Sequence, residues 1–198
     1  MNIRHTCKLG MMIALFLALM SLSQSVTTAQ APAVALNGDV TAAAWSGFLY
    51  KFVAGSTLRP RASATTWASS GGGGCIYAVA GASEVFNVPL DLPQGSRIDY
   101  LRLYFYDTSA SDSTAWVTIY DGAGGYVDVI GVNSSGTAGY GTTQSAYMGH
   151  IVNNSSNAYV LNWRPNVTGS TMMLCGLRVA YRLSLPYSVY LPLTLKNY

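Results

Sequence analysis

Apolar and polar residues alternate along most of the chain from Phe48 onward. The alternation is clearest in residues 97–106, 114–120, 157–163 and 172–183. A period of two residues places successive side chains on opposite faces of a β-strand. We therefore expect each of these stretches to be a strand that buries one face.

Turn-forming residues separate the alternating stretches. Residues 121–125 (DGAGG) lie between two β-rich runs and predict a hairpin loop, and Asn- and Ser-rich turns at 133–136 and 153–156 end further strands. About seven or eight strands at this spacing are typical of an antiparallel sandwich. No helix longer than a turn or two is expected after the first 29 residues. The sequence predicts an all-β fold, a single antiparallel β-sandwich of jelly-roll type.

The first 29 residues follow another pattern. Arg4 and Lys8 precede an apolar run from Leu9 to Leu22, and small residues follow at 27–29. This order is typical of a secretory signal peptide. The alternative is an uncleaved anchor, but the run is shorter than the ~20 apolar residues that a membrane helix needs. We expect residues 1–29 to be removed, and the mature chain to be secreted or at the cell surface without a transmembrane segment.

The remaining chain is expected to hold one domain, the β-sandwich of residues 55–184. Residues 30–54 begin with small and turn-forming residues and are interpreted as a linker or edge segment. Residues 185–198 have two interpretations. They form either a last edge strand, whose pairing Pro186 and Pro192 would limit, or a sorting or retention signal.

Composition narrows the function mainly by exclusion. Of the 198 residues 50% are hydrophobic and only 10% are charged, with 14 Tyr and 20 Gly. Loss of the signal peptide would remove two of the 11 Lys and Arg residues and none of the 8 Asp and Glu, which leaves a net charge of +1. Nucleic-acid binding needs clustered basic residues, and so does docking on anionic lipid. Neither is expected here.

Two cysteines remain after the signal peptide, Cys75 and Cys175. In an exported protein two such thiols most often form a disulfide; the alternative is a pair of buried free thiols. Neither has a Cys or His at the spacing of a metal site. A disulfide would place the strand that begins at Cys75 beside the strand that contains Cys175.

Residues suited to catalysis are few. The mature chain has one histidine, His150, which we interpret as a strand residue facing solvent. Glycosidases usually use paired carboxylates, but nothing in the sequence selects a pair among Glu84, Asp39, Asp91, Asp99, Asp107, Asp112, Asp121 and Asp128. We expect a protein that is not an enzyme and has no cofactor. Asp107 and Asp112, with the carbonyls between them, are weak calcium candidates.

Aromatic residues are the stronger candidates for ligand binding. A ring with a polar group presents a flat apolar surface suited to proteins or sugars. The alternative is that these rings fill the core or form cross-strand pairs. The candidates are Tyr104, Tyr106, Trp45, Trp67 and Tyr140.

A set of short motifs runs through the domain: LRPR at 58–61, GCIY at 74–77, LPQG at 92–95, YDTS at 106–109, GYG at 139–141 and LCGLRVAY at 174–181. From about residue 55 to 183 the chain resembles a group of secreted bacterial β-sandwich proteins without an assigned activity. The tail sequence VYLPL at 189–193 is similar to a YLPL ending on exported proteins of Chloroflexi-type bacteria. These resemblances imply export and domain limits, and no function.

The sequence thus favours a secreted or cell-surface β-sandwich with a structural, adhesive or matrix role. The alternative is a carbohydrate-binding module that uses exposed aromatic residues, and a weaker one is an extracellular hydrolase with an unrecognised carboxylate pair. The expected partner is an extracellular or cell-surface protein or glycan, and self-association is also plausible.

Overall fold

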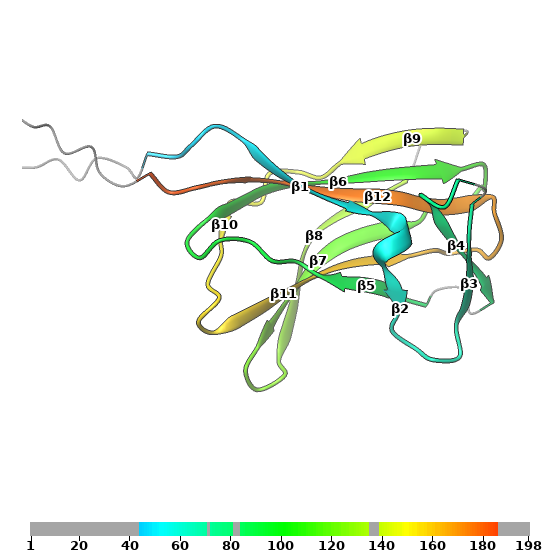
Figure 1. Cartoon of the computed structure of the whole chain (residues 1–198), viewed down its shortest axis with the longest axis horizontal. Coiled ribbons are helices and arrows are strands. Elements are labelled where there is room, and N and C mark those ends of the chain that lie inside the picture. The colour runs from blue at the N-terminus through cyan, green and yellow to red at the C-terminus, as the bar shows by residue number, and fades with distance from the viewer. Residues whose placement is uncertain (1–43, 71, 81–83, 135–138, 186–198) are drawn as a thin grey trace, which may run out of the picture. The chain divides into compact units, whose positions relative to one another are not determined.

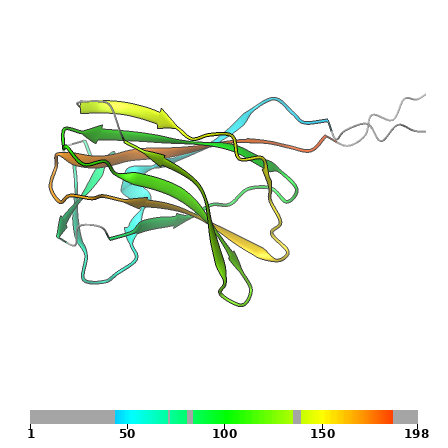
Figure 2. The ribbon, with the colours of Figure 1, turned by 180° about the vertical axis from the view of Figure 1, so that it is seen from behind.

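The computed structural model describes residues 44–70, 72–80, 84–134 and 139–185. These residues form two antiparallel sheets that pack face to face, as Figures 1 and 2 show. The predicted all-β sandwich of jelly-roll type is confirmed. The described residues form twelve strands because several short ones join the longer strands that the alternation predicts.

The larger sheet has seven strands, and β6 and β12 form its centre. Its strands are β1 (Leu49–Ala54), β3 (Thr66–Ser69), β4 (Ile76–Ala80), β6 (Arg97–Asp107), β9 (Gly139–Gln144), β10 (His150–Ile151) and β12 (Met172–Arg182). β9 and β10 pair with the free edge of β6, while β1 and β4 pair with the free edge of β12. β3 extends the sheet beyond β4.

The smaller sheet has five strands in the order β2-β5-β11-β7-β8. Its strands are β2 (Arg59–Pro60), β5 (Phe86–Pro89), β7 (Thr114–Asp121), β8 (Tyr126–Asn133) and β11 (Asn157–Arg164). The predicted hairpin loop joins β7 to β8, where the Asp121 carboxylate accepts the backbone N–H groups of Ala123 and Gly125 at 2.9 and 2.7 Å. In β8 the backbone of Ile130 has a φ of 53°, at the irregularity where β8 shifts its register against β7.

The hydrophobic core lies between the sheets and is built from the alternating positions of both. In β6 the side chains of Leu101, Leu103 and Phe105 point inward and are buried. From the other sheet Trp163 packs on Phe86 with ring centroids 5.4 Å apart. Each such side chain contributes about 1.5–3 kcal/mol by leaving water. Packing of the inner faces therefore fixes the two sheets, and with them the positions of the side chains on their outer faces.

The predicted disulfide is confirmed. Cys75 and Cys175 are bonded at a sequence separation of 100. The start of β4 accordingly lies beside β12, where Ile76 is opposite Leu174. The bridge ties β4 to the central strand of the seven-stranded sheet.

Several predictions concern the ends of the chain. Residues 1–29, the expected signal peptide, lie outside the described residues, as do residues 186–198 of the tail. The segment 30–54 contributes β1, which pairs with β12 over six residues, and Trp45 forms an isolated bridge with Ser184. Within the described ranges, no helix is long and apolar enough to cross a membrane.

Candidate functional site

The outer face of the seven-stranded sheet carries most of the exposed aromatic side chains. The register places Tyr104 of β6 opposite Gly176 of β12 and opposite Thr142 of β9, and it places Tyr50 of β1 opposite Ala180 of β12. Alternate residues of these four strands therefore face outward together. Phe48, just before β1, and Tyr147, between β9 and β10, join them by contacts with Tyr100. We call the whole set the aromatic face: Phe48, Tyr50, Phe52, Tyr100, Tyr104, Tyr106, Tyr140, Tyr147, Arg102, Arg178 and Arg182.

The rings of the aromatic face contact one another across strands. The ring centroids of Phe52 and Tyr104 lie 5.3 Å apart, and those of Tyr106 and Tyr140 lie 4.9 Å apart, both with an edge toward a face. Pairs at this distance stabilise each other by about 0.5–1.5 kcal/mol. Even so, Tyr50, Phe52 and Tyr140 remain 55%, 54% and 71% exposed. The rings are held in position but are still accessible to a ligand.

Gly176 leaves room for the ring of Phe52. A Cβ atom at this position would lie 2.6 Å from Cζ of Phe52. The absence of a side chain therefore lets Phe52 lie across β12 and reach Tyr104.

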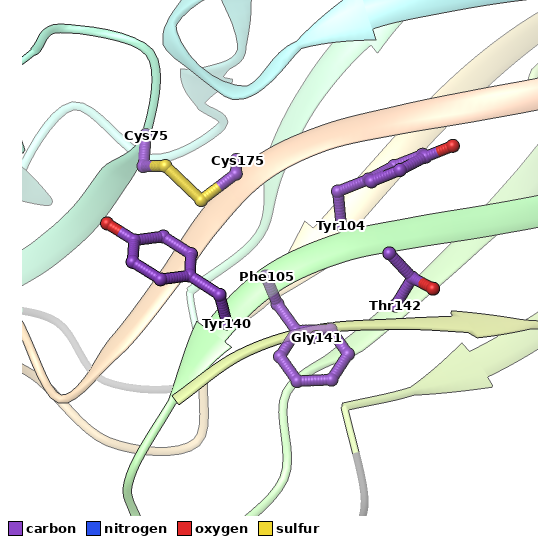
Figure 3. A pocket seen from close by; sticks show the side chains of 7 residues that line it. All are labelled: Cys75, Tyr104, Phe105, Tyr140, Gly141, Thr142 and Cys175. Atoms are coloured by element: carbon purple, nitrogen blue, oxygen red, sulfur yellow. A yellow bond between two sulfur atoms is a disulfide. The ribbon is translucent and has the colours of Figure 1, made fainter. Parts of the chain in front are cut away.

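An open groove of about 340 Å³ runs along the aromatic face next to the disulfide (Figure 3). Tyr104 and Tyr140 flank it, and the Cys75–Cys175 bridge closes one side. Thr142 lies beside Tyr104, whereas the ring of Phe105 points away into the core. The groove is thus almost wholly apolar.

Arginine side chains lie among the rings. The guanidinium of Arg178 lies 4.6 Å from the centroid of Tyr50 and 5.7 Å from that of Tyr104, and the guanidinium of Arg182 lies 3.9 Å from that of Phe48. These distances are in the range of cation–π attraction. The arginines therefore orient the rings and add positive charge to the face.

Asp99 supplies a carboxylate at one end of this region. It is only 1% exposed, and its two oxygens pair with Nε of Arg97 at 2.6 Å and with Nε of Arg182 at 3.1 Å. The hydrogen bond to Asp99 raises the pKa of Arg97 above its ordinary value. This carboxylate is fully used in holding the arginines that surround it.

The structure brings three of the five predicted aromatic residues together. Tyr104, Tyr106 and Tyr140 belong to the aromatic face. Trp45 is half-buried under the guanidinium of Arg97, which lies 4.4 Å from its ring, at the end where β6 begins. Trp67 of β3 packs partly against the core and lies 4.9 Å from the guanidinium of Arg59, so it does not join the face.

Sequence reasoning missed the contribution of β1 and the arginines. Phe48, Tyr50 and Phe52 alternate with other residues in the same way as the tyrosines of β6. That alternation was a usable signal, but it falls in the segment interpreted as a linker or edge. Arg178 and Arg102 also alternate within their strands, yet their proximity depends on pairing between distant parts of the chain.

Of the two weak calcium candidates, the Asp107 carboxylate has a structural role. Asp107 is buried, and its carboxylate accepts the backbone N–H of Ser109 at 2.9 Å and the hydroxyl of Ser134. The backbone carbonyl of Asp112 accepts a hydrogen bond from the Asn166 side chain. Over the described part of the chain, no three His, Cys, Asp or Glu residues are grouped as a metal site would require.

Two of the other carboxylates weighed as catalytic candidates, Asp121 and Asp128, have hydrogen-bond partners within the fold. Asp121 holds its hairpin turn, and Asp128 accepts the hydroxyl of Thr118 at 2.5 Å. Asp39 lies outside the described residues. These contacts give Asp121 and Asp128 structural roles.

His150 does not face solvent as predicted. It is half-buried in β10, and its Nε2 lies 3.0 Å from the hydroxyl of Tyr159 in β11. That hydroxyl also accepts the backbone N–H of Asn153 at 2.8 Å, so it is free to donate to the histidine. Burial lowers the pKa of His150 below its ordinary value, which favours the neutral ring that accepts this bond.

A second hollow, of about 460 Å³, lies on the five-stranded sheet and is lined in part by Trp116, Tyr126 and Asp128. Beneath it the hydroxyl of Thr118 accepts hydrogen bonds from Nε1 of Trp116 at 3.1 Å and from Nδ2 of Asn162 at 2.8 Å. The hollow also includes Tyr120, Arg61 and Arg164, so this sheet too carries rings and arginines, above a layer of buried polar contacts.

No family model matches the chain, and no curated protein is similar to it at a significant level. Several solved structures are similar. An exo-β-1,3-galactanase from Phanerochaete chrysosporium is 14% identical with a TM-score of 0.43, over 66% of this chain and 29% of that chain. The C-terminal CBM6 of LamC from Zobellia galactanivorans is 14% identical with a TM-score of 0.40, over 66% of this chain and 98% of that one.

The carbohydrate-binding module CBM36, solved with calcium and xylotriose, is 10% identical with a TM-score of 0.38, over 67% of this chain and 97% of that one. The chain thus spans less than a third of the galactanase. At these identities and scores the similarity concerns the fold alone. The fold and the face define a disulfide-bonded β-sandwich with an exposed aromatic surface.

Proposed function

We propose that this protein is a non-catalytic carbohydrate-binding module that acts outside the cell and binds a saccharide chain on its aromatic face. The observation that carries this proposal is the set of exposed rings held on neighbouring strands of one sheet. A monomeric soluble protein rarely exposes a large apolar patch unless the patch binds something. The location rests on the expected signal peptide and on the disulfide, which persists in oxidising compartments.

The chemistry of the face suits a sugar. A pyranose ring has an apolar face of C–H groups and a rim of hydroxyl groups. An exposed tyrosine offers a flat ring for the first and a hydroxyl for the second. Tyr50 and Tyr104 lie on strands two apart in the sheet, about 10 Å, so contact with both requires a chain of sugars rather than one.

The direct test is a binding titration of the purified, oxidised protein against a panel of soluble polysaccharides. Tyr104→Ala and Tyr140→Ala should each weaken binding about two- to tenfold, since each removes an aromatic contact of about 0.5–1.5 kcal/mol. Tyr126→Ala is the matched control, because Tyr126 is 67% exposed and belongs to the other sheet. It should leave binding unchanged.

Two results would overturn the proposal. If no polysaccharide binds, the aromatic face has another role. If Tyr126→Ala abolishes binding while Tyr104→Ala does not, the site lies on the five-stranded sheet. An assay for new reducing ends belongs in the same experiment, since their release would show a hydrolase instead.

The second candidate is a structural or adhesive role through self-association. It is favoured by the exposed aromatic residues on the outer face of β1, where Tyr50 is 55% exposed and Phe52 is 54% exposed. Such a surface would also bury well against a second copy. Analytical ultracentrifugation separates the two. A concentration-dependent dimer that Phe52→Ala disrupts, without any saccharide affinity, would favour the structural role.

A further inference from the structure

We propose that the saccharide bound by the aromatic face is acidic, a chain whose sugars carry carboxylate groups. This inference rests on the proposed function and specifies its ligand. Its basis is the arrangement of the arginine side chains among the rings and of the one carboxylate beside them.

Two arginines face each other at the centre of the sheet. Arg102 of β6 and Arg178 of β12 are directly opposite in the register. The Cβ atoms of such a pair lie about 4.5–5.5 Å apart, and like charges at this position destabilise a sheet. A sandwich selected for stability alone has no reason to place two cations there. An anion bound over the pair would relieve the repulsion.

Neither charge has a carboxylate partner among the described residues. Arg102 donates from Nη2 and Nε to the side-chain oxygen of Gln144, at 2.7 and 3.2 Å. Arg178 lies on the rings of Tyr50 and Tyr104. Both contacts orient a guanidinium without neutralising it. A stacked guanidinium also keeps N–H groups at its edge that can donate to a carboxylate.

The acid beside this region is already engaged. Asp99 is buried and pairs with Arg97 and Arg182. Its single negative charge therefore offsets the positive charge of Arg97 and Arg182. The positive charges of Arg102 and Arg178 are not offset by it. The local field is positive although the whole chain carries a net charge of only +3.

The size of this charge favours an acidic saccharide over nucleic acid. Nucleic acids present a phosphate at every step, and proteins that bind them make about 6–10 phosphate contacts. One pair of free arginines suits one or two carboxylates, and the rings beside it can take the apolar faces of the sugars. Both features together describe a uronic-acid polymer.

The test compares polymers that differ in charge alone. The purified, oxidised protein is titrated with polygalacturonate, with the same polymer after methyl esterification, and with alginate as a second uronate. We expect a uronate to bind about tenfold or more tightly than the ester. Because salt shortens the screening length from about 8 Å to about 3 Å between 0.15 and 1 M, this preference should shrink at 1 M salt.

Charge-removing variants locate the effect. Arg178→Gln and Arg102→Gln should each weaken binding to the uronate about three- to tenfold more than they weaken binding to neutral polymers. The control is Arg164→Gln, which removes the same charge from an exposed position on the five-stranded sheet. Thermal unfolding of each variant checks that the fold is intact. If one of the two variants does not fold, the other, on a different strand, still tests the proposal.

The outcomes separate this inference from the proposed function. Equal binding of uronates and neutral polymers, or equal losses in Arg164→Gln and Arg178→Gln, overturns the acidic ligand while saccharide binding stands. Equal binding of dextran sulfate overturns the specificity for carboxylates, and tighter binding of single-stranded DNA overturns the saccharide as ligand. Absence of binding to every polysaccharide overturns the proposed function itself.

Discussion

Loss of the Cys75–Cys175 disulfide should be among the most destabilising single changes in this protein. The bond closes a loop of 100 residues, which contains most of both sheets. The chain-entropy model assigns about 4.7 kcal/mol to a loop of that length. The total free energy of unfolding of a protein is typically about 5–15 kcal/mol. Opening the bridge should therefore remove a third or more of the free energy of unfolding.

The assay is urea unfolding of the oxidised wild type, Cys75→Ser, Cys175→Ser and the double variant. All three variants should lose the same free energy, because each removes the same constraint from the unfolded chain. The slope of the free energy against urea should rise, since an unbridged unfolded chain exposes more surface. At about 2–4 °C per kcal/mol, the melting temperature should fall by about 10–20 °C.

The reasoning fails if a single variant loses less than about 1 kcal/mol with an unchanged slope. It also fails if the double variant loses much more than either single one, because the thiols would then contribute by packing rather than by closing the loop. Wild-type protein in reductant is the internal control and should unfold like the variants.

Three further predictions concern single positions. Gly55→Ala should destabilise the fold by about 1–3 kcal/mol or more in urea, because the added Cβ would lie 2.1 Å from the backbone oxygen of Leu174; a neutral result would contradict that contact. Asp99→Asn should cost about 1–3 kcal/mol, less than a fully buried ion pair because its two arginine partners are partly exposed. Burial lowers the pKa of His150, so the unfolded chain binds more protons than the folded one near that pKa. The stability that depends on His150 should be complete above about pH 6.5 and decline as the pH falls below it, and a His150→Gln variant that melts with the same pH dependence would disprove this.

The alternation of the sequence located the long strands well. The stretch 97–106 corresponds to β6 (Arg97–Asp107), and 172–183 corresponds to β12 (Met172–Arg182). A period of two is a local property that each strand shows by itself. The disulfide was also predictable, because the sequence has only two cysteines after the signal segment.

Pairing between distant strands could not be predicted in the same way. Arg102 and Arg178 are 76 positions apart by their numbers, and nothing near either residue indicates the other. His150 shows the same limit, because its partner Tyr159 lies in a strand of the opposite sheet. Register depends on the whole sheet, so the aromatic face became apparent only when the order of the strands was known.

The outer surfaces of the two sheets differ in a way that stability alone does not explain. A sheet with one face in water normally places polar residues there. The five-stranded sheet follows this rule in part, since Arg61, Asp128 and Arg164 line its outer hollow together with Trp116, Tyr120 and Tyr126. On the seven-stranded sheet β6 instead presents Tyr100, Tyr104 and Tyr106 outward while burying leucines inward. Exposed rings favour aggregation, so the larger group of exposed rings on the seven-stranded sheet is best explained by a ligand that covers them.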